Sequence, residues 1–182
     1  MVLDPAAVYD ALVTQDRLRL PELPRTHGIY ALYDHAGDMR YIGITPVDPH
    51  GFHGRINNRH VTGSEGRSHK FSHAYNTGRM WRNKRDNGAD AKVAKDLRSH
   101  FARRYCRATI VPVERELHAL LPTFEKAVQA KAPAGQLLWL NKRGFDPYDE
   151  PVALVDSLLS ELAFTSEQHA ALGRQQARWS AS

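Results

Sequence analysis

Residues 28–45, with the sequence GIYALYDHAGDMRYIGIT, carry the strongest structural signal in the chain. Two apolar, aromatic-rich runs, GIYALYD and DMRYIGIT, are separated here by the turn residues His35, Ala36 and Gly37. Apolar runs on either side of a short turn that contains glycine are typical of a β-hairpin. We therefore expect two antiparallel strands at this position.

Helices and one more strand are predicted on either side of the hairpin. Asp4 followed by Pro5 marks the capped start of a helix, and residues 18–24, which contain Pro21 and Pro24, are expected to be a connector. The elements predicted after the hairpin are a loop at 46–54, helices at 54–61, 68–85 and 90–105, a third strand at 106–113, a helix at 114–131 with Pro122 near its middle or at a second start, and an irregular or extended segment at 133–140.

The last part of the chain is predicted to be helical. Residues 147–151 contain two prolines and mark a boundary, after which 152–164 has apolar residues at helical spacing. Thr165 and Gln168 match a capping box that opens a final helix. We therefore predict an α+β fold, with a small three-stranded antiparallel sheet flanked by helices and a helical C-terminal extension. The predicted divisions are 1–25 (helix and connector), 26–146 (main domain) and 147–182 (extension).

Composition excludes several classes of protein. The chain has 182 residues, of which 42% are hydrophobic and 25% charged, and this is close to the average of globular domains. It has no apolar run near the roughly 20 residues that a membrane helix needs, and its acidic start (Asp4) is unlike a secretory signal. A single cysteine, Cys106, cannot form an internal disulfide. We expect a soluble, cytoplasmic protein that binds no membrane.

Positive charge is concentrated in one stretch. Between Gly66 and Arg107 there are twelve Lys and Arg against three Asp, a balance of +9, so that the rest of a chain of net charge +5 carries −4. A basic segment on an otherwise acidic chain is the electrostatic signature of a polyanionic partner, most often a nucleic acid. The alternative is an ordinary solvated helical surface.

Two tripeptides of the hairpin, Gly28-Ile29-Tyr30 and Tyr41-Ile42-Gly43, resemble the pair that defines the GIY-YIG nuclease superfamily. The resemblance extends in the same order through Arg55, His60, Glu125 and Asn141, and it spans roughly residues 26–141. It implies metal-dependent hydrolysis of a nucleic-acid phosphodiester on the small sheet described above.

Tyr30 is then the expected general base, with Tyr41 lining the site and orienting the nucleophile or the phosphate. A tyrosine activates water only as a phenolate or by passing its proton onward, and its unperturbed pKa is about 10. A neighbouring guanidinium and a divalent metal would both lower that pKa. Gly28 and Gly43 are expected to allow close packing or close approach of substrate, with a simple bulge at Gly43 as the alternative.

Arg55 is the candidate ligand of the scissile phosphate, because a guanidinium binds phosphate oxygens bidentately and keeps its charge. The family places a histidine or tyrosine one helical turn after this arginine. In GRINNRH (54–60) the residue one regular turn on is Arg59, and His60 follows it. We expect His60 in the site, brought round by an irregular helix, and keep Arg59 as the alternative.

Glu125 is the expected metal ligand, since Mg²⁺ (or Mn²⁺) accepts one carboxylate together with waters and phosphate oxygens. Glu114 and Glu116 compete for this role but fit the spacing to Asn141 less well. Asn141 and His69 are expected to bind substrate phosphate. Five histidines (His50, His53, His60, His69 and His73) are close in sequence, but no spacing typical of structural zinc accompanies them.

The leading hypothesis is therefore a stand-alone, Mg²⁺-dependent DNA endonuclease, restriction-like or associated with mobile elements or defence. RNA is the less favoured substrate, and a homodimer would allow both strands to be cut. The alternative is a catalytically inactive DNA- or RNA-binding module of the same fold.

Overall fold

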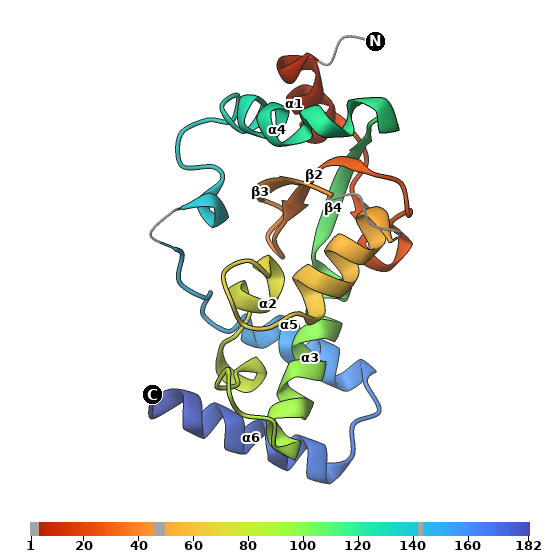
Figure 1. Cartoon of the computed structure of the whole chain (residues 1–182). Helices are drawn as coiled ribbons and strands as arrows, with labels where there is room; N and C mark the ends of the chain where they lie inside the picture. Colours follow the sequence, from red (N-terminus) through yellow and green to blue (C-terminus); the bar gives the residue numbers. More distant parts are fainter. Residues whose placement is uncertain (1–3, 46–49, 142–143) are drawn as a thin grey trace. The chain divides into compact units, whose positions relative to one another are not determined.

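The computed structural model describes residues 4–45, 50–141 and 144–182 (Figure 1). By their internal contacts these residues form two compact units. The sheet unit takes its residues from Met1–Asn58 and Tyr105–Gly144, and the helical unit from Arg59–Arg104 and Phe145–Ser182. The predicted main domain, 26–146, draws residues from both units. Part of the predicted loop at 46–54 (residues 46–49) lies outside the described residues.

The sheet unit contains one antiparallel sheet, with four strands in the order β1-β4-β2-β3 among the described residues. The strands are β1 (Leu18–Arg19), β2 (Gly28–Tyr33), β3 (Met39–Ile44) and β4 (Arg107–Pro112). The predicted α+β class is confirmed, but the prediction of three strands is wrong. The extra strand, β1, has only two residues beside Pro21, and this is too short to show an alternating pattern.

The hairpin of β2 and β3 is confirmed at the predicted position. Tyr30 lies opposite Gly43 and Leu32 opposite Tyr41, and the register shifts between Leu32 and Tyr33. Asp34 stabilises the turn, because its Oδ1 accepts hydrogen bonds from the backbone N–H groups of residues 36 and 38. Its other carboxylate oxygen accepts one from Arg40 Nε at 2.7 Å.

Helices α1 (Pro5–Thr14) and α4 (Leu121–Gln129) pack against each other and on the sheet, as Figure 1 shows. The predicted cap of α1 is confirmed, since Asp4 Oδ1 accepts from the N–H of residue 6 at 3.1 Å. Alternate residues of the hairpin face these helices. The buried core formed in this way contains Val8, Leu12, Ile29, Ala31, Tyr33, Met39, Ile42, Val113, Leu121 and Val128.

The helix predicted at 114–131 forms in two pieces, a 3₁₀ helix η4 (Arg115–Leu120) followed by α4. Pro122 lies in the first turn of α4, where its missing N–H costs nothing, so the alternative of a second start is confirmed. The segment predicted to be irregular ends in a short 3₁₀ helix, η5 (Leu138–Leu140).

The helical unit contains α2 (Lys70–Ala74), η3 (Gly78–Met80), α3 (Ala89–Tyr105), α5 (Val152–Glu161) and α6 (Ser166–Ser180). The single helix predicted over 68–85 is wrong. Helix α2 ends at Ala74, and Gly78 has a φ of +50°, which lies outside helical geometry; a Cβ at this position would collide with Glu150. The capping box is confirmed, because Thr165 and Gln168 exchange hydrogen bonds between side chain and backbone.

A buried ionic cluster lies inside the helical unit. Glu65 forms ion pairs with Arg82 and Arg98, and all three side chains are almost completely buried. Arg98 Nη1 also donates to Met80 O at 3.2 Å and to the side chain of Asn76. Two cations and one anion are thus held away from water, with the Nε of Arg98 lacking a hydrogen-bond partner among the described residues.

In the part of the chain that the structure describes, no helix has both the length and the apolar character required to span a membrane.

Candidate active site

The two motif tyrosines lie side by side on the sheet face opposite the core. Tyr30 on β2 is completely buried and Tyr41 on β3 is 9% exposed, and their ring centroids are 6.0 Å apart. Because strand side chains alternate, Ile29, Ala31 and Ile42 point into the core while both tyrosines point to the other side. The hairpin therefore places the two hydroxyl-bearing rings together, as the motif pair implies.

Gly43 leaves the room that this tyrosine pair needs. A Cβ at residue 43 would lie 2.7 Å from Tyr30 Oη and 2.5 Å from Tyr41 Cε1. Both distances are shorter than a nonbonded contact allows, so any other residue would displace a ring. These distances support the expectation that Gly43 allows close packing, rather than the alternative of a simple bulge.

Arg55 reaches Tyr30 from the helical segment η2 (His53–His60). The half-buried guanidinium donates from Nε to Tyr30 Oη at 3.4 Å. Burial opposes its charge, but interactions with Tyr30 and Tyr41 outweigh burial and raise the pKa of Arg55 above its ordinary value. The predicted arginine and the predicted base are therefore in contact.

Phe52 supports Tyr30 and was not predicted from the sequence. Its fully buried ring meets the Tyr30 ring edge-on at a centroid distance of 6.3 Å. The backbone N–H of Phe52 donates to Thr26 O at 2.9 Å, which ties the start of the segment to the residues before β2. A single phenylalanine in a Gly- and Pro-rich loop gives no periodic signal by which to find it.

Glu125 is half-buried on α4 and acts electrostatically on both tyrosines. One turn later on the same helix, Gln129 Nε2 donates to Ile42 O at 2.9 Å, between the two β3 motif residues Tyr41 and Gly43. Gln129 thus fixes the helix that carries Glu125 against the strand that carries Tyr41. The competing carboxylates, Glu114 and Glu116, are both exposed.

Both tyrosines are held in the neutral form. Burial is the main reason that the pKa of Tyr30 lies well above its ordinary value of 10.0, and the proximity of Tyr41 raises it further. Arg55 lowers the pKa of Tyr30 without offsetting these effects, and Glu125 raises it slightly. Burial and Glu125 likewise raise the pKa of Tyr41. The arginine alone therefore does not produce the phenolate that the sequence-based mechanism invokes.

A dependence of stability on alkaline pH follows from the raised pKa of Tyr30. Above pH 10 an unfolded tyrosine loses its proton while folded Tyr30 keeps it, so the free energy of unfolding falls as pH rises. The slope approaches about 1.4 kcal/mol per pH unit for each such group. We expect Tyr30→Phe to show a shallower loss than the natural chain in denaturant titrations from pH 8 to 11. Equal slopes for the two proteins would contradict the assignment.

The helical segment that contains Arg55 is irregular. Residues 53–60 form a π-helix, in which hydrogen bonds connect residues five apart rather than four apart. His60 is the fifth residue after Arg55 in the sequence, and Arg59 is exposed. His60 is fully buried in the helical unit, where its Nδ1 accepts from the backbone N–H of Lys70 at 3.1 Å. Its catalytic role stays a prediction.

The other two predicted substrate ligands, His69 and Asn141, belong to different units. His69 is half-buried in the helical unit, and its Nδ1 lies 3.1 Å from Ser64 Oγ. Asn141 is exposed at the end of η5 in the sheet unit, and the turn predicted to follow it at 142–143 lies outside the described residues. No cluster of three or more His, Cys, Asp or Glu suited to a metal occurs within 4–45, 50–141 and 144–182.

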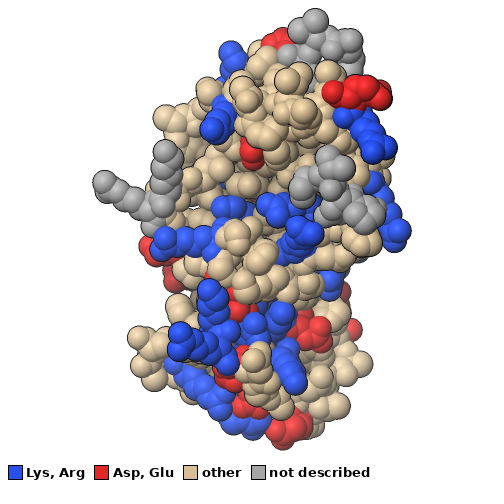
Figure 2. All heavy atoms as spheres, in the orientation of Figure 1, with Lys and Arg blue, Asp and Glu red and all other residues tan. Residues whose placement is uncertain are grey.

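Several arginines between Gly66 and Arg107 are neutralised by ion pairs with acidic side chains. Arg79 pairs with Glu150 and Asp156, Arg104 pairs with Glu161, and the two arginines of the buried cluster pair with Glu65. The exposed cations of the stretch include Arg67, Lys84, Arg85 and Lys92. Figure 2 shows Lys and Arg side chains gathered on one face of the helical unit, with acidic side chains among them. The charge available to a polyanion is therefore smaller than the count of +9 suggests.

The geometry is thus a buried tyrosine pair in contact with an arginine and under the electrostatic influence of one glutamate. No family model, curated protein or solved structure matches this chain.

Proposed function

We propose that this protein is a metal-dependent endonuclease of the GIY-YIG type that hydrolyses DNA phosphodiester bonds. The observation that carries the proposal is the contact of Arg55 Nε with Tyr30 Oη, beside Tyr41 and within electrostatic reach of Glu125. Tyr30, Tyr41 and Arg55 meet on one sheet face, and Glu125 acts on both tyrosines electrostatically from α4. A phosphodiesterase needs a proton acceptor, a fixed cation for the phosphate and a carboxylate for a metal, and this group contains a candidate for each role.

Arg55 is suited to the phosphate. A guanidinium has five N–H donors, so donors remain for the non-bridging oxygens of a phosphodiester while Nε contacts Tyr30. Its half-buried position strengthens the attraction relative to a solvent-exposed arginine. In the proposed mechanism Arg55 binds the scissile phosphate and holds the hydroxyl of Tyr30 toward the attacking water.

Glu125 is suited to Mg²⁺ or Mn²⁺. The donor set around the tyrosines offers one carboxylate, and Mg²⁺ is often held by one or two carboxylates, several waters and substrate oxygens. A bound divalent cation would polarise the phosphate and stabilise the negative charge that develops on it. A cation held by Glu125 would also oppose the effect of that carboxylate on the pKa of Tyr30 and Tyr41, and would so lower the free energy needed to ionise either hydroxyl.

A nucleic-acid-binding module without turnover is the second candidate. The raised pKa of Tyr30 favours it, because a fully buried, neutral tyrosine is a poor base until other charges reach it. The exposed cations of the helical unit would serve this function equally well. RNA is the less favoured polymer in either case, and two copies of the chain, or two successive nicks, would be needed to cut a duplex.

Plasmid cleavage distinguishes these two functions. Supercoiled DNA incubated with the purified chain should be nicked or linearised in Mg²⁺ and stay intact in EDTA. Glu125→Gln should lower the rate by about 100-fold or more, because it removes the metal-binding charge but keeps the shape of the side chain.

Glu114→Gln is the matched control, since it removes an exposed carboxylate of the same unit. It should cleave like the natural chain. Retarded migration of intact plasmid, with a steep dependence on salt, would instead identify the binding module. Equal loss in both variants would refute Glu125 as the metal ligand.

A further inference from the structure

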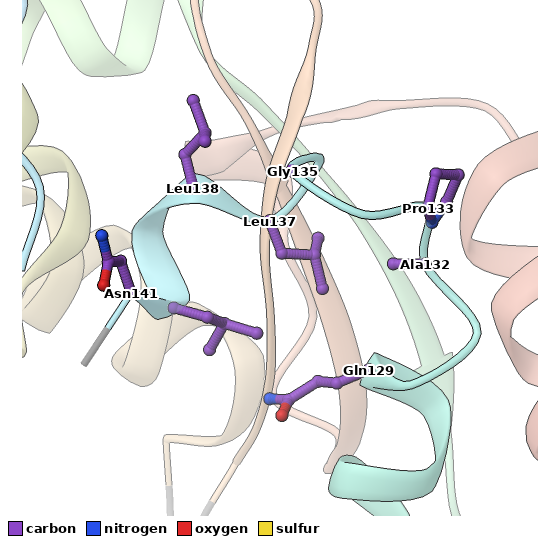
Figure 3. A pocket seen from close by; sticks show the side chains of 8 residues that line it. Gln129, Ala132, Pro133, Gly135, Leu137, Leu138 and Asn141 are labelled. Atoms are coloured by element: carbon purple, nitrogen blue, oxygen red, sulfur yellow. The ribbon is translucent and has the colours of Figure 1, made fainter. Parts of the chain in front are cut away.

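A pocket of about 320 Å³ lies between the end of α4 and the segment that leads into η5, entirely within the sheet unit. Figure 3 shows Gln129 at the end of α4 and Leu137 on the following segment, with their side chains directed toward the space between the two. The residues that line the pocket are Gln129, Ala132, Pro133, Gly135, Leu137, Leu138, Leu140 and Asn141. Its volume is at the lower end of the range for small-molecule sites, which suits a single ring system.

The lining specifies the chemistry of the occupant. Three leucines and a proline provide apolar walls, and two primary amides, on Gln129 and Asn141, provide the side-chain polar groups. None of the eight lining residues is charged, so the pocket is not built for a phosphate or a carboxylate. Apolar walls with amide groups suit a neutral, flat heterocycle, and carboxamides are the side chains that pair with the edges of nucleobases.

The position of the pocket connects it with the proposed active site. Gln129 follows Glu125 by four residues on α4, so the two side chains lie on the same helix face one turn apart. The Gln129 amide is also bonded to Ile42 O, between Tyr41 and Gly43. A base in this pocket would therefore lie beside β3, the strand that carries Tyr41.

We propose that this pocket binds one unpaired nucleobase adjacent to the scissile phosphate. The inference rests on the proposed function and adds a class of substrate to it. A base can enter such a pocket only after leaving its stack, so single strands, mismatches and branched ends are preferred over a perfect duplex. Leu138, which is 47% exposed, forms the rim over which the base enters.

Binding is measured first, without cleavage. A short single-stranded oligonucleotide with one 2-aminopurine is titrated with the full chain in EDTA, and the fluorescence of that base is followed. Leu138→Ala should weaken binding several-fold, because it removes one apolar wall but disturbs no buried side chain. Ala132→Leu should weaken it about tenfold by filling the pocket. Ala134→Leu, at an exposed neighbour outside the lining, should bind like the natural chain.

Cleavage is then compared between a duplex with one unpaired base and the fully paired duplex of the same sequence. The natural chain should prefer the unpaired substrate about tenfold, and Ala132→Leu should lose this preference while still cutting the paired duplex. If the chain cleaves in Mg²⁺ but Leu138→Ala and Ala132→Leu both behave like the natural chain, the pocket assignment is overturned and the nuclease stands. If the chain cleaves nothing yet the binding results hold, the nuclease fails and the base-binding pocket stands.

Discussion

Tyr30→Phe is expected to lower Mg²⁺-dependent cleavage by about 10²–10⁴-fold while the chain still folds. Phenylalanine keeps the buried ring and its edge-on contact with Phe52, and it removes only the hydroxyl that Arg55 contacts at 3.4 Å. The measurement is the initial rate of plasmid nicking, taken beside a thermal unfolding curve. A rate within twofold of the natural chain would rule out Tyr30 as the proton acceptor.

Tyr33→Phe provides the matched control. Tyr33 lies on the same strand, is also buried, and points to the core face, where its hydroxyl donates to Leu12 O at 2.7 Å. That carbonyl also accepts from Thr109 Oγ1, so it keeps one donor in the variant. The same chemical change should therefore cost about 1 kcal/mol of stability and leave cleavage nearly unchanged. Loss of cleavage in both variants would indicate damage to the sheet rather than loss of a base.

Glu65→Gln is expected to lower the free energy of unfolding by about 3–5 kcal/mol. The change leaves Arg82 and Arg98 buried with no opposing charge in their cluster, and the effect is the cost of that uncompensated charge. Denaturant titration of the full chain measures it. Glu161→Gln, which breaks an exposed pair with Arg104 in the same unit, should cost less than about 1 kcal/mol. Similar losses in both variants would contradict this account.

The same glutamate predicts sensitivity to acid. Burial alone would raise the pKa of Glu65, but the hydrogen bond from Arg82 and the charge of Arg98 outweigh burial and lower it. As pH falls, the glutamate gains its proton in the unfolded chain before it does so in the folded chain. The stabilisation of the folded chain is therefore complete at pH values above the ordinary pKa range of glutamate, and it is lost as pH falls through the lowered pKa of folded Glu65.

The sequence predicted those parts of the fold that depend on interactions between residues close together in the chain. The hairpin, the proline start of α4 and the two helix caps at Asp4 and Thr165 each depend on a few neighbouring residues. Strand β1 and the break in the helix predicted over 68–85 depend on partners far away in sequence, namely β4 and Glu150. No window of sequence contains both partners, so these features could not be predicted from pattern alone.

The candidate site shows the same division. Tyr30, Tyr41, Arg55 and Glu125 were predicted through the motif resemblance; the structure brings the first three together, and Glu125 influences both tyrosines electrostatically. Phe52 and Gln129, which position two of them, carry no motif and act through a ring contact and a bond to a backbone carbonyl. The effective charge of the basic stretch was also overestimated, because the acidic partners of its arginines include residues of α5.

The strand order has a consequence for how the chain is made. Strand β4 lies between β1 and β2, yet it follows them in sequence by the whole first segment of the helical unit. During synthesis the hairpin leaves the ribosome with one edge of β2 open, and the backbone opposite Tyr30 is supplied only when Ile110 has emerged. The nascent chain therefore exposes an unpaired apolar edge for several seconds at ordinary elongation rates. A ribosome-stalled chain that ends before β4 would be an aggregation-prone intermediate, and its capture by a chaperone would be a feature of its biosynthesis rather than of the finished protein.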